Sequence, residues 1–257
     1  MKLFAAFLTL LLGAALYSAE NLIKTDPGQL PVTGTLKVID AENGVFKAGK
    51  GRLNGTQLIA VDASKSYRLS GFLRGAADCG RVLMGVQCFD SNKRSIGMHN
   101  ICTVAGTATV LTSAAEKGSN EFFIADGSSW EKIPGKVAAF NCKDDFSDLP
   151  NHNTIYYVTK VEKSGEVWKV TTTKALPRTY PAGTAMRLHR DGGFINAIAF
   201  VKPNAQWQEF SAVLGKAQVN VNVHKNLWPG TAYVKLFINI YPGSEVEIKD
   251  IKLIEEQ

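Results

Sequence analysis

The fold is decided by the C-terminal stretch YVKLFINIYPGSEVEIKDIKLIEEQ, residues Tyr233–Gln257 of a chain of 257 residues. Apolar side chains occupy every second position at its start, namely Val234, Leu236, Ile238 and Ile240. A period of two residues predicts a half-buried β-strand with one face toward a core. The opposite side of this strand is unusual because it carries aromatic residues among polar ones, namely Tyr233, Lys235, Phe237, Asn239 and Tyr241.

The same alternation recurs along much of the chain. Strands are predicted for SYRLSGFLRG (66–75), VLMGVQCF (82–89), INAIAFVKP (195–203), WQEFSAVLG (207–215) and AQVNVNVHKN (217–226). β-Branched and aromatic residues, which suit a pleated and half-buried surface, dominate these segments. We find no sustained helical period after the N-terminal segment. The chain is therefore predicted to be all-β, of the sandwich or barrel type.

The middle of the chain differs from the flanking parts. Residues 107–190 contain short predicted strands separated by turn signals such as Pro134-Gly135, and a hairpin with its turn at Lys163–Gly165. We predict that residues 107–190 form a small β-barrel-like domain inserted into a discontinuous sandwich made of residues 20–106 and 191–257. The alternative is one larger sandwich with long structured loops.

The N-terminal segment has the layout of a secretory signal peptide. Lys2 is followed by an apolar run and then by small residues, and residues 1–19 are too short and wrongly flanked for a membrane span. An N-terminal membrane anchor is the alternative. No later segment is apolar enough to span a bilayer. We therefore expect a secreted or periplasmic protein.

Charge and cysteine content limit the partners and the chemistry. The net charge of +6 comes from lysines and arginines scattered among acids, which disfavours nucleic acid as a partner. Four cysteines are present, at positions 79, 88, 102 and 142. Export permits disulfides, and we expect one bridge among the first three because they lie close together in sequence.

Five segments, in order, resemble one family. They are ENLIKTDPG (20–28), YRLSGFLRG (67–75), VQCFDSNKRSIG (86–97), WQEFSAVL (207–214) and VEIKDIKLIE (246–255). Together they are similar to the galactose-binding-like jelly-roll carbohydrate-binding modules attached to xylanases and glucanases. The resemblance covers the host segments and not residues 107–190. It implies a jelly-roll β-sandwich that binds polysaccharide without catalysis.

The aromatic side of the last-but-one strand is the predicted ligand site. Aromatic rings can stack on the apolar face of a sugar, while planar polar groups bind its hydroxyls. The predicted contacts are Tyr233, Lys235, Phe237, Asn239 and Tyr241. Arg68, Phe72 and Arg74 would extend this face if the two strands share one sheet, and Trp228, in the loop NLWPG, would add an exposed platform. Alternatively, the insert covers these aromatics or they cover a second small core, and the loop with Trp228 plugs one end of the sandwich.

A structural calcium ion is also predicted. Calcium takes carboxylate and carbonyl oxygens as ligands. Asp250, near the end of the chain, and Asp40 or Glu42, near its start, could meet where the terminal strands pair. The resembling modules often place an Asn-x-x-Phe-Glu motif near a calcium, and that motif is missing here. The alternative is that Asp250 only caps a turn.

Catalytic signatures are weak in this sequence. The four histidines form no HExxH motif, and no GxSxG motif occurs. We therefore expect a protein that is not an enzyme. Two other functions stay open: a structural or adhesive surface protein that binds a protein partner, and a polysaccharide hydrolase or lyase.

Overall fold

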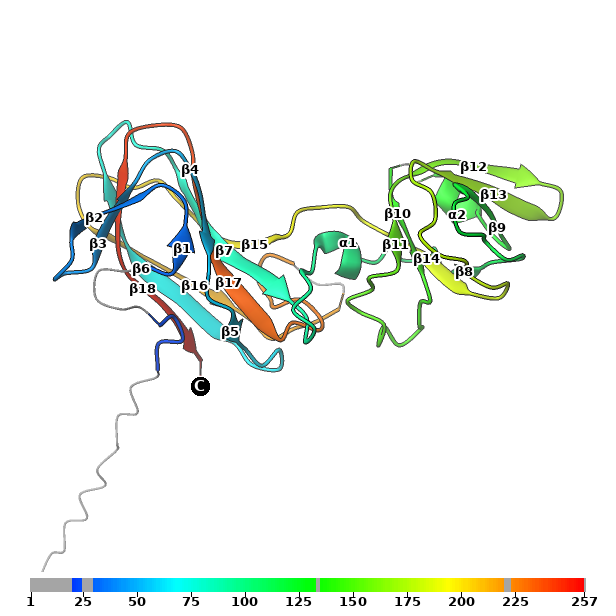
Figure 1. The fold of residues 1–257 in the computed structure, drawn as a ribbon, viewed down its shortest axis with the longest axis horizontal. Coiled ribbons are helices and arrows are strands. Elements are labelled where there is room, and N and C mark those ends of the chain that lie inside the picture. The colour runs from blue at the N-terminus through cyan, green and yellow to red at the C-terminus, as the bar shows by residue number, and fades with distance from the viewer. Residues whose placement is uncertain (1–19, 25–29, 133–134, 220–222, 257) are drawn as a thin grey trace, which may run out of the picture.

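The computed structural model describes residues 20–24, 30–132, 135–219 and 223–256. The predicted signal peptide, residues 1–19, lies outside the described residues. The all-β prediction is confirmed, because strands dominate and the helices α1 (Met98–Ile101) and α2 (Ser128–Glu131) have four residues each. In the described part of the chain, no helix is long and apolar enough to cross a membrane. Figure 1 shows two lobes at opposite ends of an elongated molecule.

One sheet of the large lobe has six strands, ordered β1-β4-β17-β7-β15, with β5 pairing with β17 beside β4. The strands are β1 (Val32–Thr33), β4 (Gly51–Gly55), β5 (Ile59–Ala60), β7 (Val82–Phe89), β15 (Ile195–Val201) and β17 (Tyr233–Ile240). Every pairing in this sheet is antiparallel. Strand β17 therefore lies in the middle of the sheet, and its neighbours come from distant parts of the chain.

The second sheet of the large lobe has five strands, in the order β16-β6-β18-β3-β2. They are β2 (Leu36–Asp40), β3 (Val45–Ala48), β6 (Tyr67–Gly75), β16 (Gln208–Leu214) and β18 (Val246–Glu255). One hydrophobic cluster contains buried residues of both sheets, such as Leu69 and Leu253 from this sheet and Met84 and Ile238 from the other. The two sheets are thus the two layers of a sandwich.

The small lobe contains two further antiparallel sheets. One has the order β11-β10-β14-β8 and the other β12-β13-β9. Their strands are β8 (Thr109–Val110), β9 (Glu121–Ile124), β10 (Val137–Phe140), β11 (Thr154–Ile155), β12 (Val158–Ser164), β13 (Val167–Thr172) and β14 (Ala185–His189). A second hydrophobic cluster, formed by buried residues between Leu111 and Leu188, fills this lobe.

The chain enters the small lobe after α1 and returns to the large lobe after β14 (Figure 1). Buried residues of the first cluster lie between Ile23 and Ile101 and again between Phe210 and Leu253. The predicted hairpin is present, since β12 and β13 pair as far as Ser164 and Val167 and Gly165 adopts a positive φ of 62°. The jelly-roll topology stays a prediction, as does the domain division at residues 107 and 190.

Two sequence-based expectations were wrong. The described residues of AQVNVNVHKN, at 217–219 and 223–226, form no strand and instead belong to the loop between β16 and β17. Alternation alone does not make a strand when no neighbouring strand is there to pair with it. All four cysteines are free, so the expected bridge is absent. Cys88 points from β7 into the core, and burial raises its pKa to about 11.

Candidate functional site

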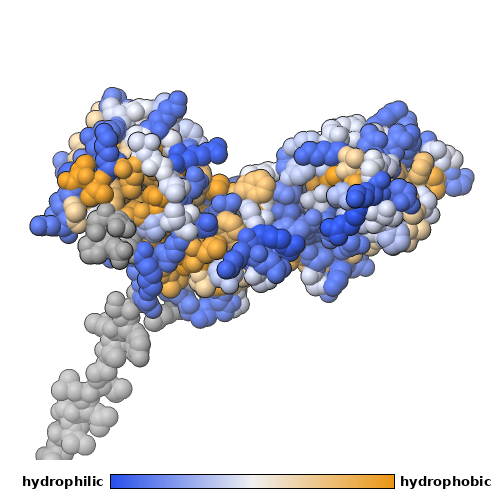
Figure 2. Space-filling view, in the orientation of Figure 1, coloured by the Kyte–Doolittle hydropathy of each residue, from blue (hydrophilic) through white to orange (hydrophobic). Residues whose placement is uncertain are grey.

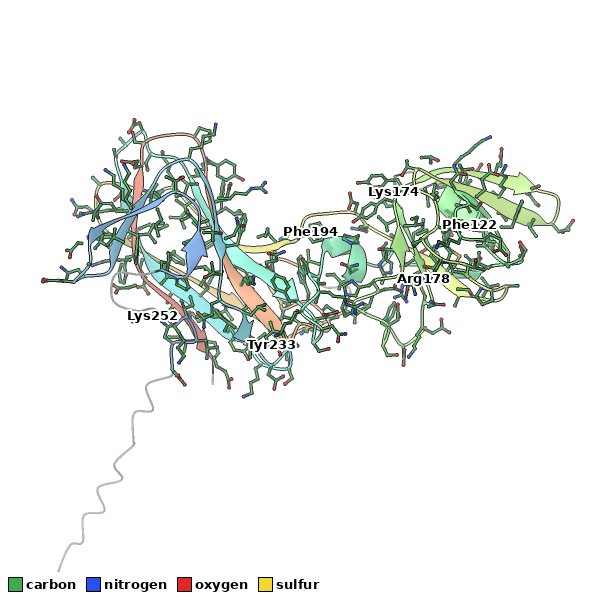
Figure 3. The ribbon with its side chains drawn as sticks, viewed as in Figure 1. Phe122, Lys174, Arg178, Phe194, Tyr233 and Lys252 are labelled. Carbon is green, nitrogen blue, oxygen red and sulfur yellow. The ribbon has the colours of Figure 1, made fainter. Side chains whose placement is uncertain are left out.

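Strand β17 separates its two sets of side chains as its alternation predicts. Val234, Leu236, Ile238 and Ile240 are buried in the sandwich core. The intervening residues therefore point away from the core, on the outer side of the six-stranded sheet. Tyr233 lies at the end of the large lobe nearer the small lobe (Figure 3).

Neighbouring strands add residues to this outer side that the sequence did not identify. On β7, Phe89 is opposite Tyr233, Gln87 is opposite Lys235 and Leu83 is opposite Asn239. On β15, Phe200 is opposite Leu83. We call this surface the aromatic face, made of Leu83, Gln87, Phe89, Phe200, Tyr233, Lys235, Phe237, Asn239 and Tyr241. Figure 2 shows apolar residues among polar ones on the surface of both lobes.

Two groups of rings and cations lie on the aromatic face. In one group, the Phe200 and Tyr241 rings meet edge to face with centroids 5.5 Å apart, and the Arg81 guanidinium lies 5.3 Å from the Phe200 centroid. Phe200 is 52% exposed and Tyr241 is 42% exposed. In the other group, the Lys235 ammonium lies 5.5 Å from the centroid of the Phe89 ring, beside the half-buried Tyr233. Both groups combine an apolar ring surface with a positive charge.

Phe237 does not provide an open ring. Only 5% of it is exposed, so the prediction that it stacks on a ligand is wrong. Its neighbour on β7 is Gly85, which has no side chain, and its neighbour on β4 is Asn54. The ring is absent from the sandwich core cluster, so it is buried on the outer side of the sheet. Phe237 therefore stabilises the aromatic face from beneath and is not a surface for a ligand.

Arg68, Phe72 and Arg74 do not extend the aromatic face. They lie on β6, in the five-stranded sheet, whereas β17 belongs to the six-stranded sheet. Their strand neighbours Leu69 and Leu73 point into the core, so these three side chains point outward on the opposite side of the sandwich. Two of them are held in ion pairs, Arg68 with Glu256 and Arg74 with Glu247.

The outer side of the five-stranded sheet has an aromatic group of its own. The Arg74 guanidinium lies 4.5 Å from the centroid of the Trp207 ring, and the Lys249 ammonium lies 4.7 Å from it. Lys249 also lies 5.7 Å from the centroid of Phe72. Trp207 is half-buried and is not part of the core cluster of the large lobe.

Trp228 is not an exposed platform. It is 1% exposed and belongs to the hydrophobic core of the large lobe. Its Nε1 donates a hydrogen bond to the carbonyl oxygen of Val223 at 2.8 Å, which satisfies its one polar group. The turn signal of NLWPG is real, since Gly230 adopts a positive φ of 73°, but the loop folds inward.

The predicted calcium ligands have other local roles. Both carboxylate oxygens of Asp40 accept hydrogen bonds from Asn43, at 3.1 and 2.7 Å, and these bonds hold the pKa of Asp40 below its ordinary value. Glu42 is exposed in the same turn, and Asp250 adopts a φ of 53° where the register of β18 shifts. Among the described residues, no group of three or more His, Cys, Asp or Glu side chains could hold a metal ion. The calcium site stays a prediction.

A buried network of ionisable side chains occupies the small lobe where it meets α1. The Arg187 Nε donates to His189 Nε2 at 2.9 Å, and the Arg187 Nη2 donates to the Asp148 carboxylate at 2.6 Å. His189 Nε2 must therefore be unprotonated, and its Nδ1 donates to the carbonyl oxygen of His99 at 2.7 Å. Burial lowers the pKa of His189 to about 4. The network joins the last strand of the small lobe to α1, and we assign it a structural role.

Acidic groups are distributed unequally between the two sheets. The six strands of the sheet that carries the aromatic face contain no Asp or Glu, while Arg52 and Lys235 give them two cations. Strand β18 of the other sheet alone contains Glu247, Asp250 and Glu255. The aromatic face thus offers rings, amides and positive charge, which can bind a ligand with apolar patches, hydroxyls and negative groups.

No family model matches the chain, and no curated protein matches it in sequence.

Proposed function

We propose that this protein is an exported, non-catalytic carbohydrate-binding protein that holds an acidic polysaccharide on its aromatic face. The observation that carries this proposal is the exposed Phe200–Tyr241 pair with Arg81 beside it, in a sheet whose strands contain no acid. The predicted signal peptide supports export.

The chemistry of the face matches that of an acidic sugar chain. A pyranose ring has an apolar face of C–H groups, which can lie against the exposed rings of Phe200 and Tyr241. Its hydroxyl groups can bond with the amides of Gln87 and Asn239, which both donate and accept. Carboxylate or sulfate groups can pair with Arg81 and Lys235, and arginine binds such groups in a bidentate manner.

Binding is a better proposal for this face than hydrolysis. Glycosidases use two carboxyl groups that flank the scissile bond. The six strands beneath the aromatic face contain no carboxylate side chain to fill either role. A protein partner on the same face is the main competing function, and the experiment below distinguishes the two.

The test is affinity electrophoresis of the mature protein through native gels containing a polysaccharide. We expect slower migration with polygalacturonate or a sulfated polysaccharide than with neutral xylan or glucan. The variants Phe200→Ala and Tyr241→Ala should each restore most of the free mobility. Phe194→Ala is the matched control, because this ring is also exposed, at 45%, but lies in the connection between the lobes.

Three outcomes would contradict the proposal. One is the absence of retardation by any of the polysaccharides. Another is equal retardation of the wild type and both face variants, which would place binding elsewhere. The third is self-association or protein binding that depends on Phe200 and Tyr241 without any glycan binding, which would favour an adhesive role.

A further inference from the structure

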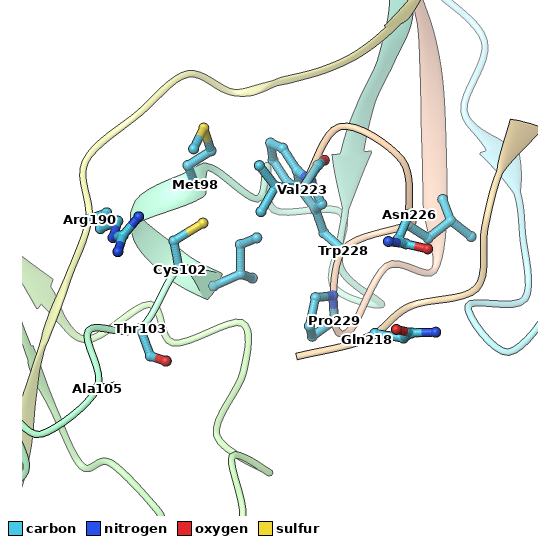
Figure 4. A pocket seen from close by; sticks show the side chains of 12 residues that line it. Met98, Cys102, Thr103, Ala105, Arg190, Gln218, Val223, Asn226, Trp228 and Pro229 are labelled. Carbon is cyan, nitrogen blue, oxygen red and sulfur yellow. The ribbon is translucent and has the colours of Figure 1, made fainter. Parts of the chain in front are cut away.

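A cavity of about 400 Å³ lies where the two connections between the lobes meet the loop that joins β16 to β17. One wall comes from α1 and the segment that follows it, with Met98, Ile101 and Cys102, and from Arg190 just after β14. Figure 4 shows Val223, Trp228 and Pro229 across the cavity from Arg190. Its volume falls within the range of about 300–1,000 Å³ that is typical of small-molecule sites.

The wall of the cavity is apolar for most of its extent. Met98, Val223 and Pro229 are partly exposed and contribute apolar surface, whereas Ile101, Leu227 and Trp228 of the same lining are buried. Trp228 is fixed in place, because its ring is buried in the core and its Nε1 bonds to Val223. An apolar ligand body would therefore meet a wall that is already formed, which lowers the entropic cost of binding.

Arg190 is the one cation among the described residues that line the cavity. The ion pairs between described residues do not include Arg190. The described residues of the lining include no Asp or Glu. Burial raises the pKa of the Cys102 thiol to about 11, so this thiol is neutral at pH 7. The cavity therefore combines an uncompensated positive charge with an apolar wall.

We propose that this cavity binds a small organic anion with an apolar body, such as a carboxylate or sulfonate attached to an aromatic or alkyl group. Its negative group pairs with Arg190, and its apolar part lies against the partly exposed side chains of Met98, Val223 and Pro229. The polar side chains of Gln218 and Asn226 lie on the same lining and can orient the ligand. This site is separate from the aromatic face and does not depend on polysaccharide binding.

The test uses two fluorescent probes of nearly equal shape. 1-Anilinonaphthalene-8-sulfonate carries a negative charge, whereas N-phenyl-1-naphthylamine lacks it. We expect both to bind the full mature chain with one-to-one stoichiometry. Arg190→Met keeps the apolar stem and removes the charge. It should weaken binding of the sulfonate about tenfold or more, as expected for a lost charge-assisted hydrogen bond, and change binding of the neutral probe less than twofold.

A second variant tests the location. Ala105 lines the cavity from an exposed position, so Ala105→Trp should fill the space without disturbing the core, and both probes should bind at least tenfold more weakly. Circular dichroism and the melting temperature verify that each variant is folded. The proposal is overturned if neither probe binds the wild type one-to-one. It is also overturned if Arg190→Met leaves sulfonate affinity unchanged, or if Ala105→Trp leaves both affinities unchanged.

Discussion

The Phe200 ring stands edge-on to the Tyr241 ring at an interplanar angle of 78°, although the two residues come from strands that are not neighbours. Strand β7 separates β15, which carries Phe200, from the end of β17, which precedes Tyr241. The backbone places them together, because Phe200 pairs with Leu83 and the amide of Tyr241 bonds to the carbonyl of Arg81 at 2.9 Å. The two rings therefore meet because of the order in which the strands pair in the sheet.

The first prediction concerns the energy of this pair. Because both rings are largely exposed, Phe200→Ala and Tyr241→Ala should each lower the free energy of unfolding by no more than about 1 kcal/mol. A double-mutant cycle should show a coupling energy of about 0.5 kcal/mol, at the lower end for aromatic pairs. Urea denaturation of the four proteins measures it. Strictly additive losses would show that the rings do not interact.

The second prediction concerns Phe237. Phe237→Ala should destabilise the protein by about 3–5 kcal/mol, because removing a buried ring loses its transfer free energy and leaves a cavity. The measurement is the midpoint of urea unfolding, with Phe200→Ala as the exposed control from the same face. A loss as small as that of the control would mean that Phe237 is open to solvent and would restore it as a ligand contact.

The sequence was informative about strands and their faces. The alternation in 233–240 correctly separated Val234 and Ile238 from Tyr233 and Lys235, because the direction of side chains in a strand is a local property. The hairpin turn at Gly165 was also predictable, since a positive φ favours glycine. Both features depend on residues close together in the chain.

The sequence was not informative about the order of strands in each sheet. The alternation of apolar and polar residues in β6 agrees with the outward direction of Phe72. The sheet to which Phe72 belongs, however, is set by the pairing of β6 with β16 and β18. Trp228 was misjudged for a related reason. Its turn signal is local, whereas its burial depends on a core that distant strands build. Phe89 and Phe200 were missed because their proximity to β17 also results from long-range pairing.

The third prediction concerns the cysteines. Because the four thiols are free, denaturation in urea with iodoacetamide and no reductant should add four carbamidomethyl groups per chain, as counted by mass spectrometry. In the native state at pH 8, Cys79 and Cys88 should react far more slowly than in urea, since both are buried and burial raises the pKa of Cys88. Labelling of only two thiols in urea would reveal a disulfide and contradict the structure.

The fourth prediction is the pH dependence of the small lobe, which follows from the environment of His189. Protonation of Nε2 would break its bond with Arg187 and place two cations side by side in a buried site. Asp148 forms its ion pair with Arg187, and its charge offsets only part of the effect of burial on the pKa of His189. Burial alone would raise the pKa of Asp148, but hydrogen bonds from Arg187, Asn151 and the Lys143 amide outweigh it and keep the pKa below its ordinary value.

The folded state therefore holds His189 neutral down to a pKa of about 4, whereas the unfolded chain binds a proton near the ordinary value of 6.5. Between these values the unfolded state binds more protons, so the contribution of His189 to the free energy of unfolding should decrease as the pH is lowered, by at most about 1.4 kcal/mol per unit. The same contribution should stay constant above pH 7. Hydrogen exchange of small-lobe peptides at several pH values measures this slope. His189→Gln, which cannot titrate, should have a shallower slope, leaving the smaller effects of His99 and His152, whose pKa values burial also lowers. Equal slopes in the two proteins would show that His189 is not the buried base that sets acid stability.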